Sequence, residues 1–241
     1  MKIDGEHLQS IWYAKESDTV KIIDQTLLPH KFKVVDLKNL SDACNAINSM
    51  KVRGAPLIGV TAAYGVYLAL KENPKQLETA MHELLNTRPT AINLRWALGR
   101  MHESLRGIDE EVLIQKALET ALLIEKEDAA ICEAIGNHGL PLLQALWNKK
   151  KDHQECLNIL THCNAGALAA VDWGTALSVI YKTAEAGVPI HVWVDETRPR
   201  NQGALLTCWE LSKMGVPNTL IVDNAGGHLM QIGQVDVCVV G

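Results

Sequence analysis

The most constraining feature of the sequence is a series of short apolar segments after residue 156 that alternate with helical patterns. These segments are Leu157–Thr161, Ile190–Val194, Thr219–Val222 and Val235–Val240. Continuously apolar strands separated by helices are typical of a parallel sheet that is covered on both faces. The sequence therefore predicts a doubly wound, Rossmann-like α/β domain over residues 151–241, cut short after its fourth strand.

The first 150 residues follow a different, mainly helical pattern. Short β-like runs at Thr19–Ile23 and Phe32–Leu37 indicate a small β lead-in. Ser41 is the expected N-cap of the first helical pattern, and the lysine-containing run Asn148–His153 is interpreted as a solvated linker. We therefore expect a mostly helical N-terminal domain over residues 1–150, with helices near 41–50, 55–71, 74–86, 91–105 and 109–136.

Composition and charge exclude several classes of function. The 23 Lys and Arg against 28 Asp and Glu give a net charge of -5, so there is no basic field for nucleic acid. No apolar stretch approaches the ~18 residues needed to cross a bilayer, and the N-terminus lacks signal-peptide features. The six cysteines form no CxxC pair, so no metal site is predicted. We expect a cytoplasmic protein without membrane contact.

Polar, glycine-containing loops follow three of the predicted strands. They begin at His162, Asp195 and Asp223, at the sheet edge where ligands bind in doubly wound domains. Cys163 follows the first strand and precedes a predicted helix, whose positive partial charge would favour a thiolate. The alternative is a buried cysteine beside a glycine turn. The loop Asp195–Gln202 fits equally a binding loop and an internal ion-pair network.

A candidate anion-binding site lies in the predicted helical domain, residues 1–150. Arg53, Gly54 and Ala55 stand at the start of a predicted helix, where N–H groups and a guanidinium would hold a phosphate. Arg88 precedes another predicted helix, and its guanidinium would donate further hydrogen bonds to the same anion. Neither of the nucleotide-binding motifs GxxxxGK[ST] and GxGxxG occurs in the sequence. The alternative interpretation is that these residues only mark the start of a helix and bind no anion.

Four of these segments together resemble the signature stretches of the methylthioribose-1-phosphate isomerase family. The segments are Val52–Gly59, Arg88–Leu94, Leu160–Ala169 and Asp195–Ala204, and the resemblance runs from about residue 8 to the end. The broader family includes ribose-1,5-bisphosphate isomerases and regulatory subunits of the exchange factor for eukaryotic initiation factor two. These relatives share the fold without the full cysteine motif, so Cys163 favours the isomerase branch.

The resemblance implies an aldose-to-ketose conversion in methionine salvage, from 5-methylthioribose 1-phosphate to 5-methylthioribulose 1-phosphate. It implies no metal or organic cofactor, and a homodimer. It places Cys163 in hydrogen transfer between C2 and C1. The residues that it places in contact with the sugar phosphate are Arg53, Gly54, Ala55, Arg88 and Gln202.

Two alternatives stay open at this point. One is the same chemistry on 5-deoxyribose 1-phosphate or another pentose phosphate. The motifs that bind the phosphate and the sugar ring do not distinguish between substrates with different 5-substituents. The other is a non-catalytic module like the regulatory subunits, against which the Cys163 loop argues.

The resemblance also bears on the segment that ends at Gly241. In the family, a catalytic aspartate, an arginine and an Asn-Lys pair follow this segment. They are absent from the sequence, so we expect the chain to be inactive alone. An apolar strand at Val235–Val240 without its crossover helix would be exposed, and we expect poor solubility or low stability.

Overall fold

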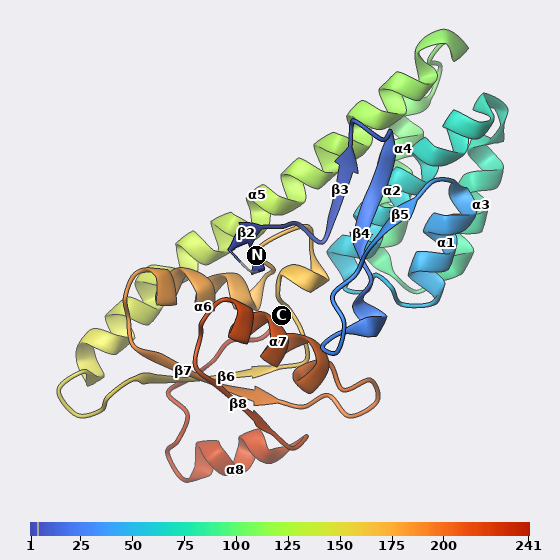
Figure 1. The fold of residues 1–241 in the computed structure, drawn as a ribbon. Coiled ribbons are helices and arrows are strands. Elements are labelled where there is room, and N and C mark those ends of the chain that lie inside the picture. The colour runs from blue at the N-terminus through green and yellow to red at the C-terminus, as the bar shows by residue number, and fades with distance from the viewer. Residues whose placement is uncertain (4) are drawn as a thin grey trace. The chain divides into compact units, whose positions relative to one another are not determined.

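The computed structural model describes residues 1–3 and 5–241, which form two compact units. Unit 1 comprises Met1–Gln9 and Ala129–Gly241, and unit 2 comprises Ser10–Asp128. Helix α5 (Glu110–Lys150) carries the chain from one unit to the other, as Figure 1 shows. The predicted division at residue 150 does not coincide with these units, because their boundary falls inside this helix.

Unit 2 contains the predicted β lead-in and the predicted helices. Its antiparallel sheet has the order β3-β4-β5, with strands β3 (Ile11–Ala14), β4 (Thr19–Ile23) and β5 (Val34–Leu37). The short 3-10 turns are η1 (Gln25–Leu27) and η2 (Pro74–Gln76). The helices are α1 (Leu40–Asn48), α2 (Ala55–Glu72), α3 (Leu77–Thr87) and α4 (Ile92–Leu105).

Helix α2 is the centre of unit 2. Every residue from Leu57 to Leu70 is buried, as expected of a helix that is apolar on all sides and surrounded by others. Helices α1, α3 and α4 pack against it. Helix α1 begins one residue earlier than predicted, and Ser41 is not its cap. The side chain of Asn39 caps it instead, accepting a hydrogen bond from the amide of Asp42 at 2.8 Å.

Unit 1 is built on a parallel sheet with the order β8-β7-β6-β9, which confirms the predicted α/β fold class. Its strands are β6 (Leu157–His162), β7 (Ile190–Asp195), β8 (Asn218–Ile221) and β9 (Val237–Cys238). The intervening elements are η3 (Ala167–Ala169), α6 (Ala176–Glu185), the π-helical turn η4 (Gly203–Thr207), α7 (Cys208–Lys213) and α8 (Ala225–Gln231).

Alternate side chains of β6 and β7 form the core of unit 1. Ile159, Val192 and Val194 are fully buried and pack with Leu177 and Ile180 of α6. Helix α8 lies on the other side of the sheet from α6 and α7 (Figure 1). The outer strand β8 is more open than the predicted two-sided burial, because it has a strand neighbour on one side only.

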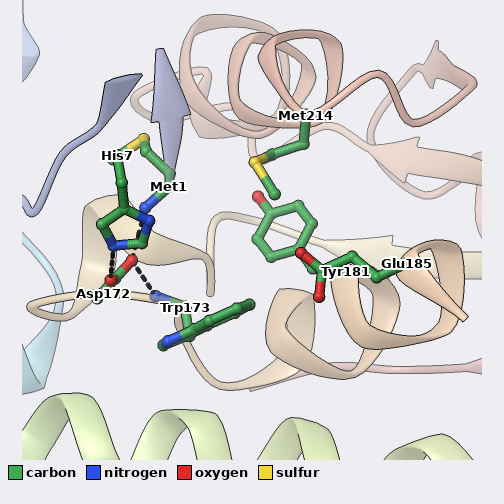
Figure 2. Close-up of a pocket in the computed structure, with 7 residues that line it drawn as sticks. All are labelled: Met1, His7, Asp172, Trp173, Tyr181, Glu185 and Met214. Carbon is green, nitrogen blue, oxygen red and sulfur yellow. Dashed lines mark hydrogen bonds and ion pairs between the residues drawn. The ribbon is translucent and has the colours of Figure 1, made fainter. Parts of the chain in front are cut away.

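The first residues of the chain belong to unit 1 through one carboxylate. The hairpin of β1 (Lys2–Ile3) and β2 (Glu6–His7) lies beside Asp172 (Figure 2). Asp172 accepts hydrogen bonds from the amino group of Met1 at 2.6 Å and from the amide of Trp173 at 2.8 Å. Its second oxygen is 2.5 Å from Nε2 of His7. These bonds explain why the segment groups with residues far along the chain.

Helix α5 continues beyond its predicted end at residue 136. It includes Pro141 and ends at Lys150, so the predicted linker begins inside the helix and that prediction was wrong. Tertiary packing outweighs the unfavourable helix propensities here. A Cβ at Gly139 would lie 2.6 Å from Val179 of α6, which shows how closely the two helices approach. No helix in the described ranges has the length and apolar character to cross a membrane.

Candidate active site at the carboxyl ends of the parallel strands

The strand order of unit 1 reverses between β6 and β9. In open parallel sheets, ligands bind beyond the carboxyl ends of the strands at such a switch point. Strand β6 ends at His162, and Cys163 is the next residue. A hypothetical Cβ at Gly241, beyond the end of β9, would lie 2.6 Å from Cβ of Ala165. The cysteine predicted from the sequence therefore lies at the position where this fold class places its ligands.

The backbone of Cys163 has an unusual conformation. Its φ is 61°, in the left-handed region that non-glycine residues adopt at a cost in free energy. The hydroxyl of Thr207 donates a hydrogen bond to the carbonyl of Cys163 at 2.5 Å. The side-chain amide of Asn164 donates to that same hydroxyl at 3.1 Å. The loop after β6 is therefore tied to the turn η4.

A buried carboxylate holds the rest of this loop. Glu210 of α7 is 0% exposed and accepts hydrogen bonds from the amides of Ala167 and Leu168 at 2.8 and 3.1 Å. It also accepts from Asn164 Nδ2 at 2.9 Å and from the Tyr181 hydroxyl at 3.0 Å. Sequence reasoning missed this residue. The available signal was an acid between Trp209 and Leu211, because a carboxylate in an apolar helix needs donors.

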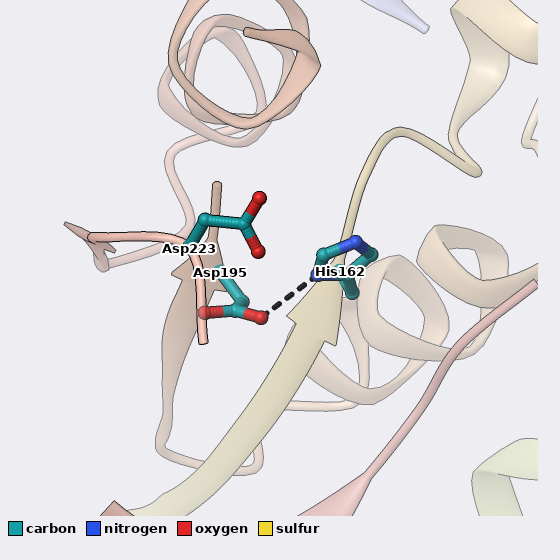
Figure 3. A group of neighbouring side chains, drawn as sticks. All are labelled: His162, Asp195 and Asp223. Carbon is teal, nitrogen blue, oxygen red and sulfur yellow. Dashed lines mark hydrogen bonds and ion pairs between the residues drawn. The ribbon is translucent and has the colours of Figure 1, made fainter. Parts of the chain in front are cut away.

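A second cluster contains His162, Asp195 and Asp223, drawn in Figure 3. One potential ligand atom from each residue lies within 4.8 Å of the others. His162 Nδ1 is 2.8 Å from Asp195 Oδ2, and the amide of Arg198 donates to Asp223 Oδ2 at 3.0 Å. Imidazole and carboxylate suit a divalent cation, but a cation would have to compete with these bonds. That the function requires no metal ion remains a prediction.

The loop after β7 is held by hydrogen bonds to backbone amides. Glu196 accepts from the amides of Thr197 and Gly203, both at 2.8 Å, and from the amide of Ala204 at 3.1 Å. Of the ion pairs among the described residues, none includes Arg198 or Arg200. The alternative interpretation of this loop as an internal ion-pair network through its arginines is therefore not supported.

Two buried oxygens at this edge accept no hydrogen bond from any described residue. They are Asp195 Oδ1 and Gln202 Oε1. Asp195 is 8% exposed, and its other oxygen already bonds His162. Buried acceptors without donors are rare in folded proteins and indicate a place for a water or a ligand hydroxyl. Gln202, predicted to contact substrate, is one of the two.

The remaining candidates lie in unit 2. Arg53 is buried, and its Nε donates to Gln25 Oε1 at 3.3 Å. Gly54 is the N-cap of α2 with a φ of 90°, and Ala55 is the first residue of that helix. Arg88 is the C-cap of α3, in the short connection that leads to α4. The predicted helix starts are thus confirmed, and the candidates form two sets, with Cys163 and Gln202 in unit 1.

Four cysteines have a pKa above the ordinary value of a thiol. Burial raises the pKa of Cys44 and of Cys208 to about 11, aided by Glu83 and Glu196 respectively. Burial also raises the pKa of Cys156 and Cys238. A raised pKa lowers the thiolate population and with it nucleophilicity. These four fit the interpretation of structural cysteines, and Cys132 is buried within α5. Cys163 is the candidate because of its position directly after β6.

Comparisons with known proteins show which family the chain belongs to. A model of the initiation factor 2 subunit family matches residues 51–241. A methylthioribose-1-phosphate isomerase of Sinorhizobium medicae is 54% identical over 243 residues, covering 100% of this chain and 66% of the relative. A second, from Methylorubrum extorquens, is 56% identical with the same coverage. The chain thus spans 66% of the length of these curated relatives.

Solved structures give the same grouping. The 5-methylthioribose 1-phosphate isomerase of Pyrococcus horikoshii has a TM-score of 0.81 and 36% identity, covering 98% of this chain and 66% of that chain. Subunit delta of the translation initiation factor eIF-2B from A. fulgidus also has a TM-score of 0.81, with 39% identity over 98% of this chain and 68% of that chain. Family model, relatives and structures together show that this chain belongs to the initiation factor 2 subunit family.

Proposed function

We propose that this chain, when extended with a family-like C-terminus, is an aldose–ketose isomerase that converts 5-methylthioribose 1-phosphate to 5-methylthioribulose 1-phosphate in methionine salvage. The observation that carries this proposal is the position of Cys163. It lies directly beyond the central strand β6, at the switch point of the sheet, in a chain that aligns throughout with methylthioribose-1-phosphate isomerases.

The proposed reaction is an internal redistribution of hydrogen. The bond from C1 to the ring oxygen breaks, the C2–H bond breaks and a C–H bond forms at C1. The proton of the C2 hydroxyl is lost as C2 becomes a carbonyl, and the former ring oxygen gains a proton. Atoms and electrons balance without an external oxidant, which agrees with the expectation of no cofactor. Cys163 is assigned to the transfer of hydrogen from C2 to C1.

The other predicted residues receive binding roles under this proposal. The phosphate of the substrate and its surroundings are assigned to Arg53, Gly54, Ala55 and Arg88. Guanidinium groups and the free amides at a helix start are suited to bind an anion. Gln202 is assigned to a sugar hydroxyl, and its unpartnered Oε1 supports that role.

The test is an isomerase assay on the 241-residue chain and on the same chain extended with a family-like C-terminus. We expect turnover in the extended chain and a loss of about 10² to 10⁴ in rate when it carries Cys163→Ala. The matched control is Cys156→Ala, because Cys156 lies just before the amino end of the same strand. Full activity of the Cys163→Ala variant would overturn the assignment.

The 5-substituent of the substrate is tested separately. Turnover of 5-methylthioribose 1-phosphate and 5-deoxyribose 1-phosphate is compared on the extended chain. A higher kcat/KM for the first compound supports methionine salvage, and a higher value for the second identifies the alternative pentose phosphate. The homodimer and the cytoplasmic location stay predictions.

A non-catalytic regulatory module is the second candidate function. The similarity to subunit delta of eIF-2B, at 39% identity, favours it. It predicts no isomerisation by either chain length and a specific protein partner. The position of Cys163 argues for catalysis, so turnover that depends on Cys163 would eliminate this candidate.

A further inference from the structure

We propose that Glu210 is a positioning residue for Cys163, and that its buried carboxylate sets the shape of the loop that carries the thiol. The importance of the thiol rests on the proposed function, in which Cys163 is catalytic. The positioning itself rests on the contacts between α7 and residues 164–168.

The two oxygens of Glu210 share the donors of this loop. Oε1 accepts from Asn164 Nδ2 at 2.9 Å and from the amide of Leu168 at 3.1 Å. Oε2 accepts from the amide of Ala167 at 2.8 Å and from the hydroxyl of Tyr181 at 3.0 Å. Three of these four donors lie within five residues after Cys163, so one rigid group fixes the segment directly beyond the thiol.

The loop fits closely around the carboxylate. A Cβ at Gly166 would lie 2.2 Å from Glu210 Oε2 and 2.6 Å from Leu177 Cδ1. Gly166 pairs with Gly174 through an isolated antiparallel bridge, which holds the loop from its other side. One turn before Glu210, Thr207 donates to the carbonyl of Cys163 itself. The same short helical segment therefore holds Cys163 at its backbone and the following residues at their amides.

This arrangement also limits where a substrate anion binds. Amides that open a helical turn beyond a parallel strand are a common phosphate seat. Here the amides of Ala167 and Leu168, which open η3, already donate to Glu210. The carboxylate of Glu210 already binds these amides, so the phosphate of a substrate must bind to other donors.

A carboxylate suits this position better than its neutral isostere. Glutamine has one acceptor oxygen, and its NH₂ group would face two of the four donors. Glu210→Gln therefore preserves the side-chain volume but removes one of the two acceptor oxygens that hold the loop.

The test measures the rate at which iodoacetamide alkylates each cysteine of the 241-residue chain, resolved by peptide mass spectrometry. Cys238 is exposed and serves as the internal reference, and buried Cys132 reports unfolding. The variant is Glu210→Gln. The matched control is Tyr181→Phe, which removes a donor to the same carboxylate that does not come from the loop.

We expect Glu210→Gln to raise the alkylation of half-buried Cys163, relative to Cys238, by at least about threefold, because the strained loop relaxes and opens. Tyr181→Phe should leave this ratio within a factor of two. An unchanged ratio in a folded Glu210→Gln variant would overturn the proposal, as would an equal rise in Tyr181→Phe.

Amide hydrogen exchange of the unmodified chain tests the same proposal if the variant does not fold. The amides of Ala167 and Leu168 should exchange slowly, and rapid exchange of both would overturn the positioning. Neither measurement requires isomerase activity. Failure of the isomerase assay with protected amides and a shifted alkylation ratio would reject the proposed function and leave the positioning in place.

Discussion

At the scale of single residues, two carboxylates of unit 1 act as acceptors for several backbone amides. Glu196 accepts from amides of its own loop and of the start of η4, and Glu210 accepts from two amides of the loop after β6. Loop amides that leave water need acceptors, and a buried carboxylate satisfies several at once. For Glu210 the apolar neighbours in the sequence indicate burial, but the donors cannot be identified from the sequence because they lie more than 25 residues away.

Asp18 in unit 2 makes an acid-sensitive contribution to stability. Hydrogen bonds from Lys71, Tyr13 and Tyr67 lower its pKa from 3.8 to about 2. A lowered carboxylate pKa stabilises the folded state above pH 3.8, and that contribution is lost as the pH falls towards 2.

We therefore expect Asp18→Asn to lower the free energy of unfolding by about 1 kcal/mol at pH 6, a small value because the side chain is half exposed. Asparagine also tolerates the φ of 48° at this position. Urea titrations at pH 6 and pH 2.5 measure the difference, which should shrink at the lower pH. A difference that is constant over this range would contradict the role of the charge.

At the scale of elements, Asp236 connects the end of α5 to the sheet. It forms an ion pair with Lys150 of α5 and accepts from the amide of Asn158 in β6 at 2.7 Å. Gln154 Nε2 donates to it at 2.7 Å. Burial raises the pKa of Asp236, but these donors outweigh burial and leave the pKa below its ordinary value.

The prediction for Asp236→Asn is a loss of about 1 to 3 kcal/mol in the free energy of unfolding at pH 7, because asparagine loses the charge that pairs with Lys150 and keeps one acceptor oxygen for three donors. Chemical denaturation monitored by circular dichroism measures it. Asp152→Asn, at an exposed position in the preceding turn, is the control and should change stability by less than about 0.5 kcal/mol. Equal effects of the two substitutions would show that Asp236 does not hold the elements together.

At the scale of the whole molecule, each unit has a core of its own. The core of unit 2 surrounds α2, and that of unit 1 lies between the sheet and its helices. Compact units with separate cores commonly unfold with some independence.

Pulsed alkylation in urea tests this independence, because Cys44 lies in unit 2 and Cys132 in unit 1. Asp236→Asn should lower the urea midpoint at which Cys132 becomes reactive by more than it lowers the midpoint for Cys44. Asp18→Asn should have the opposite preference. Midpoints that move together in both variants would show that the chain unfolds as one cooperative unit.

The sequence by itself determined the alternation of strands and helices in unit 1, the helical character of unit 2 and the choice of Cys163. Apolar periodicity and helix-start signals are local, so they can be read without knowing what packs against them. Gly54 is one example, because a φ of 90° before α2 suits glycine in any context.

Only the tertiary structure decided the path of α5 through Pro141, the boundary inside that helix and the partners of Glu210, Asp195 and Asp236. Each of these depends on contacts between residues far apart in the sequence, such as Asn164 with Glu210 or Lys150 with Asp236. Such contacts form only when the chain is compact, and at these positions they outweigh the local preferences that a sequence displays.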